Sequence, residues 1–111
     1  MILHITSRGE WAAAVRAGAY TAPSLATEGF IHLSQPHQVA GVANAVYRGV
    51  PDLVLLCVDA ERLTAPLRYE QGEHADERFP HLYGALDVAA VTDVVAFPEG
   101  PDGFSLPDGL G

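Results

Sequence analysis

The stretch LVLLCVD occupies residues 53–59, and its first six residues are all apolar. A run of this length fits a strand that is buried on both faces, and it is far too short to cross a bilayer. It therefore predicts the central strand of a sheet, around which the rest of the chain is arranged.

Shorter β-like runs lie on both sides of this strand in the sequence, at residues 2–6, 30–33, 67–70, 81–86 and 91–97. A first helix is expected after Ser7, which stands three residues before Glu10 in a capping-box spacing, and Gly18 is placed to end it. A second helix is expected from Ser34 as N-cap to Gly49, after a loop at residues 19–29 with at most one helical turn. This order favours an α+β fold: a compact, mixed or antiparallel, split β-sheet with two main helices.

The length of 111 residues matches one domain, which we assign to residues 1–97. Residues 98–111 are rich in Pro, Gly and Asp, and they predict a C-terminal tail with little regular structure. The only cysteine, Cys57, lies in the apolar run, where burial should keep its thiol inert. The first residues do not resemble a signal peptide, so a cytoplasmic location is expected.

The charge of the chain narrows its possible partners. There are 14 acidic and 6 basic residues, and the formal net charge of −8 should repel extended nucleic acids. All the basic residues are arginine, which excludes Schiff-base chemistry, pyridoxal phosphate anchoring and a Walker-type phosphate loop, because each of these requires lysine. A small molecule is the expected ligand, with no membrane partner, and the oligomeric state is left open.

Three histidines, His4, His32 and His81, stand in or next to predicted strands among large apolar residues. An imidazole in such a place needs a hydrogen-bond partner, and buried polar groups tend to share partners in a common site. We therefore expect the three rings to line one cleft. Two alternatives remain: three separately satisfied structural histidines, or a metal site of three histidines and a carboxylate. No short-spaced metal motif is present, so no metal ligand is assigned.

Several motifs in a fixed order resemble an uncharacterised bacterial family, domain of unknown function 952. They are His-Ile-Thr at residues 4–6, Glu-Gly-Phe-Ile-His-x-Ser at 28–34, Tyr-Glu at 69–70 and Phe-Pro-His-Leu-Tyr-Gly at 79–84. Seven further residues stand at matching places: Trp11, Tyr20, Ser24, Leu25, Gln38, Asn44 and Asp59. The resemblance runs from about residue 4 to residue 97. That family is grouped by fold with the ADP-ribosyltransferase superfamily, so the resemblance implies an ADP-ribosyltransferase-like fold.

Residues 4–6 and 30–34 also resemble segments of NAD-dependent RNA 2′-phosphotransferases, although Ile5 stands where those enzymes have glycine. The resemblance implies a cleft in which His4 holds a ribose of NAD. The cofactor-binding residues implied are His4, Thr6, Ser34 and Tyr83, and the catalytic residues implied are Glu70, His32 and His81. Glu70 would stabilise positive charge on the ribose as the nicotinamide bond breaks.

Glu28 and Glu73 are competing candidates for this carboxylate. The leading hypothesis is an NAD-dependent ADP-ribosyl or glycosyl transferase acting on NAD or a small nucleotide-like molecule. A non-catalytic small-ligand-binding module of the same fold is the second hypothesis, and a metal-dependent enzyme is the third.

Overall fold

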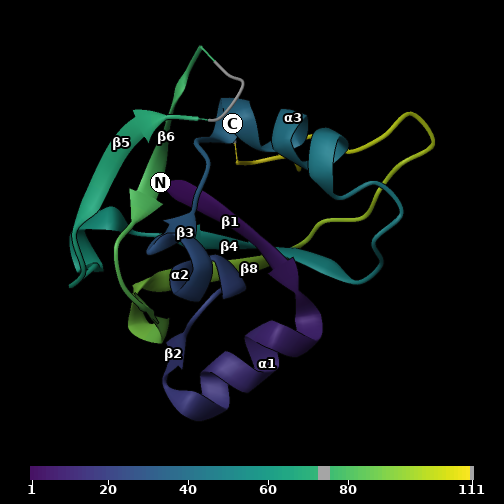
Figure 1. The fold of residues 1–111 in the computed structure, drawn as a ribbon. Helices are drawn as coiled ribbons and strands as arrows, with labels where there is room; N and C mark the ends of the chain where they lie inside the picture. The colour runs from purple at the N-terminus through teal and green to yellow at the C-terminus, as the bar shows by residue number, and fades with distance from the viewer. Residues whose placement is uncertain (73–75, 111) are drawn as a thin grey trace.

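The computed structural model describes residues 1–72 and 76–110, and within them three α-helices, two short 3₁₀ helices and eight strands (Figure 1). In chain order they are β1 (Ile2–Ser7), α1 (Arg8–Ala17), β2 (Ala19–Tyr20), α2 (Pro23–Glu28), β3 (Ile31–His32), α3 (Pro36–Val46), β4 (Leu53–Val58), η1 (Ala60–Arg62), β5 (Leu67–Gln71), β6 (Arg78–Leu82), β7 (Leu86–Asp87), η2 (Val88–Ala90) and β8 (Val91–Ala96).

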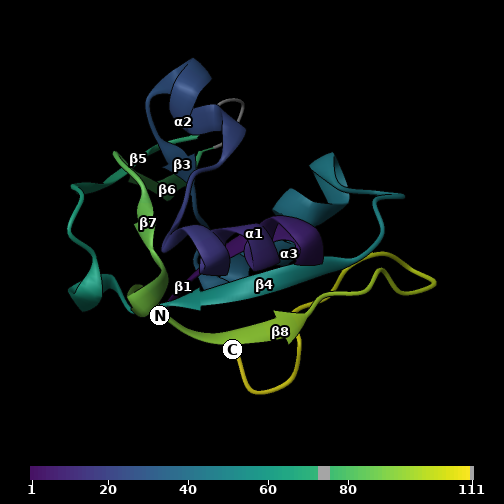
Figure 2. The ribbon, with the colours of Figure 1, turned by 90° about the horizontal axis from the view of Figure 1, so that it is seen from below.

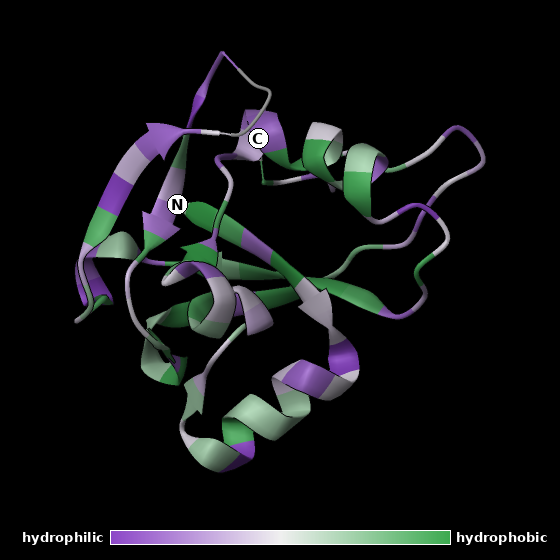
Figure 3. Cartoon of the chain, in the orientation of Figure 1, coloured by the Kyte–Doolittle hydropathy of each residue, from purple (hydrophilic) through white to green (hydrophobic). Residues whose placement is uncertain are grey.

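β4 is the middle strand of a three-stranded sheet with the order β1-β4-β8, which confirms the prediction for residues 53–59. All six residues of β4 are buried. Their side chains alternate between two apolar clusters: Leu56 and its even-numbered neighbours face α1, and Leu55 and its odd-numbered neighbours face α3. The two helices therefore cover opposite faces of this sheet (Figure 1), and hydrophobic residues mark its strands (Figure 3).

A second sheet has the order β3-β6-β5, and β2 pairs with β7 to form a third, two-stranded sheet. The second sheet lies beyond one end of the β1-β4-β8 sheet (Figure 2). The two are joined where Leu3 and Ser34 exchange backbone hydrogen bonds of 2.7 and 2.8 Å. The split sheet is thus present, but every pairing among the described residues is antiparallel, so the mixed alternative is wrong.

The helix ends follow local chemistry in α1 and depart from the prediction in α3. Ser7 caps α1 by accepting from the Glu10 amide at 3.1 Å, and Gly18 ends it with a φ of 87°. α3 has Gln35 as N-cap in place of Ser34, because the Ser34 backbone is already paired with β1. Its last residue is Val46, three before Gly49. α2 is a third helix, so the expectation of two main helices was too low.

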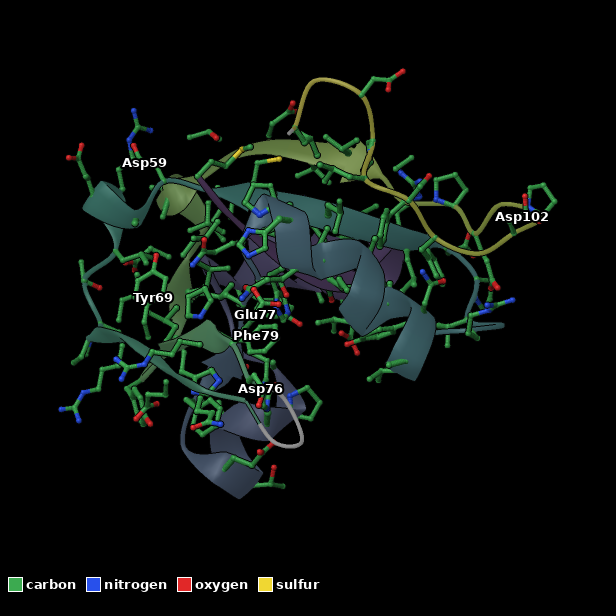
Figure 4. All side chains as sticks on the ribbon, turned by 90° about the horizontal axis from the view of Figure 1, so that it is seen from above. Asp59, Tyr69, Asp76, Glu77, Phe79 and Asp102 are labelled. Atoms are coloured by element: carbon green, nitrogen blue, oxygen red, sulfur yellow. The ribbon has the colours of Figure 1, made fainter. Side chains whose placement is uncertain are left out.

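The start of β6 is attached to α3. Gln38, buried in the first turn of α3, donates to the Arg78 carbonyl at 2.9 Å. His37 and Glu77 pair at 2.8 Å, and Figure 4 shows Glu77 and Phe79 in this part of the molecule, far from Asp59 and Asp102. These contacts fix the strand that carries His81.

The C-terminal segment after β8 contains no helix or strand among its described residues, 97–110. It is nevertheless packed against the core. The Phe104 ring lies 5.0 Å from the Phe97 ring, and both are buried. The Asn44 side chain donates to the Phe104 carbonyl and accepts from its amide, at 3.0 and 2.8 Å. None of the helices in the described part of the chain is both long and apolar enough to span a membrane.

Candidate functional site

Antiparallel pairing brings polar side chains from three strands onto the second sheet. His32 in β3 lies opposite His81 in β6, and His81 lies opposite Arg68 in β5. Side chains two residues apart on a strand point to the same face of the sheet. Glu70 therefore lies on the same face as Arg68, and Tyr83 on the same face as His81. The register therefore gathers at one place residues that are about fifty positions apart in the sequence.

Four rings and one carboxylate form what we call the aromatic–histidine cluster: Phe30, His32, Glu70, His81 and Tyr83. The Phe30 and His81 rings are stacked, with centroids 4.1 Å apart. The His32 and His81 rings meet edge to face at 5.4 Å, and Tyr83 lies 5.3 Å from Phe30. Two of the three predicted histidines thus share one site.

Glu70 is held in a defined orientation by two neighbours. Its Oε1 atom accepts hydrogen bonds from the Tyr83 hydroxyl, at 2.5 Å, and from His81 Nδ1, at 2.9 Å. These bonds hold the pKa of the Glu70 carboxyl below its ordinary value, and the bond to Glu70 raises the pKa of Tyr83. Oε2 has no hydrogen-bond partner among the described residues, and the side chain is 39% exposed. The carboxylate is therefore ionised, oriented and open on one oxygen.

His81 is oriented by the same contact. Because a carboxylate accepts only, Nδ1 carries a hydrogen, and in the neutral ring the lone pair is then on Nε2. No fully buried side-chain nitrogen or oxygen in the described part of the chain lacks a partner, and no described residue bonds to His81 Nε2. Nε2 therefore reaches solvent although the side chain is only 7% exposed. A carboxylate and an imidazole in this arrangement can act as an oriented general base.

His32 lies on the open side of the cluster. Its side chain is 54% exposed, and its Nε2 atom is 3.0 Å from a carboxylate oxygen of Glu28 at the end of α2. The Arg68 guanidinium lies 5.3 Å from the Tyr83 ring centre. Of the three candidate carboxylates, Glu70 is therefore part of the cluster, Glu28 borders it through His32, and Glu73 lies outside the described residues.

His4 belongs to a separate, buried group. Its Nδ1 donates to the His32 carbonyl at 2.7 Å, and its Nε2 lies 2.9 Å from the Tyr20 hydroxyl. The Tyr20 hydroxyl is 3.0 Å from Thr6 Oγ1, which donates to Glu10 at 2.9 Å. Burial lowers the pKa of His4 to about 4 and raises the pKa of Tyr20 to about 12. Both nitrogens of His4 already have partners inside the protein.

Of the seven predicted site residues, the structure brings together His32, Glu70, His81 and Tyr83. His4 and Thr6 lie in the buried group, behind the backbone of β3. Ser34 is buried at the junction with Leu3, and no hydrogen bond in the described part of the chain ties its side chain to the cluster.

Residues 1–72 and 76–110 contain no group of three His, Cys, Asp or Glu side chains placed to hold a metal ion. His74 lies outside these ranges. Cys57 is buried, and burial raises the pKa of its thiol, as expected for an inert residue.

The comparison with known proteins identifies the family. The model of the family described as "Protein of unknown function (DUF952)" matches residues 5–94. The chain belongs to this family. No curated protein matches the DUF952 chain at a significant level.

Solved structures of one bacterial protein resemble this DUF952 domain along almost its whole length. The crystal structure of protein CC0527 from Caulobacter crescentus is 40% identical, with a TM-score of 0.87, and the match covers 98% of this chain and 96% of that one. The solution NMR structure of CC0527 is 39% identical, with a TM-score of 0.79, and covers 93% and 89%. The family match over residues 5–94 confirms the resemblance to domain of unknown function 952, whereas neither it nor the solved structures show a relation to ADP-ribosyltransferases.

The two groups also contain Phe30, Tyr20 and Glu10, for which the sequence predicted no part in a site. Phe30 was detectable, because it alternates with His32 and so shares its face of the strand. Tyr20 was known only as a residue that matches the family, and Glu10 only by its capping-box spacing, and neither pattern places them beside His4. Tyr20 lies in β2, which has only two residues and pairs with β7 from the other half of the chain.

Proposed function

We propose that this DUF952 domain binds NAD or a related nucleotide-like molecule at the aromatic–histidine cluster and transfers its ribosyl group, with Glu70 as the catalytic carboxylate. One observation carries the proposal. Glu70 is anchored through Oε1 by His81 and Tyr83 and leaves Oε2 accessible. An ADP-ribosyltransferase-like fold, implied by the sequence resemblance, is part of the same proposal.

The chemistry of ribosyl transfer fits such a carboxylate. When the bond between ribose and nicotinamide breaks, positive charge develops on the ribose, and a fixed negative charge stabilises it. The two bonds to Oε1 keep Glu70 ionised and prevent it from turning away. The stabilising group is therefore already oriented before the substrate arrives.

The neighbours of Glu70 suit the remaining parts of the substrate. The His32 ring, in a side chain that is 54% exposed, offers a stacking surface for a planar base or the nicotinamide ring. Arg68, beside Tyr83, is the nearest cation for a phosphate group. Nε2 of His81 would accept the proton of the attacking hydroxyl, because Glu70 holds the hydrogen of the ring on Nδ1.

Binding is expected to be weak. The net charge of −8 opposes a pyrophosphate, and Arg68 is the one arginine that contacts the cluster among the described residues. We expect a Kd between micromolar and millimolar, about 4–8 kcal/mol of binding free energy. Calorimetry and thermal shift with NAD, ADP-ribose and nicotinamide measure this directly, and chromatography measures the release of nicotinamide.

The decisive variant is Glu70→Gln, which keeps the shape of the side chain and removes its charge. We expect NAD binding within about threefold of wild type and a ~10²–10³-fold slower release of nicotinamide. The matched control is Glu61→Gln, which removes the same charge from an exposed residue of η1 and should change neither quantity. No binding of NAD or ADP-ribose at millimolar concentration would overturn the proposal. Binding without release by the wild-type protein would favour the second hypothesis, a non-catalytic binding module.

A further inference from the structure

The buried group around His4 is one continuous run of hydrogen-bonding atoms. It begins at the His32 carbonyl and passes through His4, the Tyr20 hydroxyl and the Thr6 hydroxyl to the Glu10 carboxylate. The four separations are 2.7, 2.9, 3.0 and 2.9 Å, each within hydrogen-bonding range. Three of the members are buried, and Glu10 is exposed on the first turn of α1.

The number of hydrogens does not match the number of contacts. The His32 carbonyl can only accept, so His4 carries a hydrogen on Nδ1. A neutral His4 then supplies one hydrogen, and the Tyr20 and Thr6 hydroxyls supply one each. An ionised Glu10 supplies none. Three hydrogens cannot close four contacts, so the run is fully bonded only when one additional proton is present.

Two arrangements contain that proton and satisfy every contact. In the first, His4 is an imidazolium, and each donor points outward: Nε2–H to Tyr20, Tyr20 to Thr6, and Thr6 to Glu10. In the second, Glu10 is a carboxylic acid, and each donor points inward, ending with the Tyr20 hydroxyl donating to Nε2 of neutral His4. Moving three protons by one hydrogen bond each converts one arrangement into the other, and no atom is gained or lost.

We propose that His4, Tyr20, Thr6 and Glu10 form a proton-conducting chain, in which one shared proton passes between the surface carboxylate of Glu10 and the buried imidazole of His4. This proposal is independent of the function proposed above. It would give the protein a chargeable group directly behind the backbone of His32, connected to solvent through side chains alone.

The surroundings of the chain agree with this role. Besides Glu10 itself, the titratable groups whose charge acts on His4 and Tyr20 are His32 in β3 and Tyr47 after α3, and β4 presents the apolar Leu56 opposite His4. Burial lowers the pKa of His4 to about 4, which favours the arrangement that leaves the imidazole neutral.

The outer end of the chain is open to water. Glu10 and Tyr20 line a hollow of about 270 Å³ between α1 and β2, whose other walls include Ala13, Ala17 and Pro23. Water in this hollow can exchange the proton with Glu10, whereas His4 itself is buried, with 6% of its surface exposed. The carboxylate is therefore the entrance of the chain.

Nuclear magnetic resonance of the histidine ring nitrogens and of the glutamate carboxyl carbons tests the chain, from about pH 8 to about pH 4. Because one proton is shared, His4 Nε2 and the Glu10 carboxyl should titrate with a common midpoint. Tyr20→Phe removes the connecting hydroxyl, and the two midpoints should then separate. Glu61→Gln is the control and should leave the common midpoint unchanged.

Glu10→Gln gives an independent test at the surface, where a substitution does not threaten the fold. The glutamine amide can donate to Thr6, so the inward arrangement closes without an added proton. His4 Nε2 should then remain an acceptor, and its titration should disappear from this pH range. Unequal midpoints in the wild-type protein would overturn the proposal. So would a His4 titration that is the same in the wild-type protein, Tyr20→Phe and Glu10→Gln.

Discussion

His4 and His81 are both 6% exposed, yet their surroundings give them different chemistry. Both nitrogens of His4 are bonded inside the protein, to the His32 carbonyl and to Tyr20. Among the described residues His81 is bonded on Nδ1 alone, to the carboxylate of Glu70, and its Nε2 reaches solvent. The degree of burial therefore does not separate a histidine with both ring nitrogens bonded from one with an open ring nitrogen. The partners of the two ring nitrogens do.

The largest expected effect concerns the stability of the buried group. His4→Ala removes a buried ring together with its hydrogen bonds to the His32 carbonyl and the Tyr20 hydroxyl, which keeps Thr6 as a partner, so we expect a loss of about 3–5 kcal/mol of unfolding free energy. His32→Ala removes a ring that is 54% exposed and should change stability by less than about 1 kcal/mol. Urea denaturation of both variants measures the difference. Equal losses would remove the distinction between the two groups.

The next effect is the pH dependence of stability. The pKa of His4 is 6.5 in the unfolded chain and about 4 in the folded protein. Between pH 6.5 and pH 4, His4 is therefore protonated in the unfolded chain and neutral in the folded protein. The contribution of His4 to the free energy of unfolding is therefore unaffected by pH above about pH 6.5. As the pH falls towards 4, the free energy of unfolding decreases progressively, by up to about 3 kcal/mol.

The pH dependence of stability should also differ between the wild-type protein and Glu10→Gln, which lacks the carboxylate of the proposed proton chain. Uptake of the shared proton by the folded protein would partly offset the loss in the wild-type protein. Glu10→Gln cannot take up that proton, so its stability should fall more steeply below about pH 6. Denaturation midpoints at several pH values test this. Parallel curves for the two proteins would contradict the expected difference.

The smallest expected effect is that of metal removal. The three histidines are divided between two groups, and the described residues contain no arrangement that would hold a metal ion. We therefore expect the melting temperature to be unchanged by EDTA. A decrease of several degrees that zinc or iron restores would contradict this and revive the metal-dependent hypothesis.

The sequence predicted those features that are determined locally. The apolar run at residues 53–58 defines β4, because a strand that is apolar on both faces must lie inside the fold. Ser7 and Gly18 define the ends of α1, since each satisfies or permits the backbone geometry at its own position. The Glu10 side chain completes no capping box, because it bonds to Thr6.

What the sequence could not supply is strand register. His4 and His32 have similar apolar neighbours, so one cleft was expected for both. The pairing of β1 with β4 turns His4 into the interior, while the pairing of β3 with β6 places the His32 ring beside His81. A shift of one residue would reverse these faces, and nothing local to either histidine determines it.

The junction of the two sheets has a further consequence. Besides the Leu3–Ser34 pair, it is held by the ring N–H of His4 bonded to the His32 carbonyl, so a side chain there takes the place of a peptide group in the ladder. A peptide N–H exists in one form, whereas a neutral imidazole has two tautomers, and only the one with its hydrogen on Nδ1 makes this bond. The folded protein therefore selects a tautomer in order to join its two sheets.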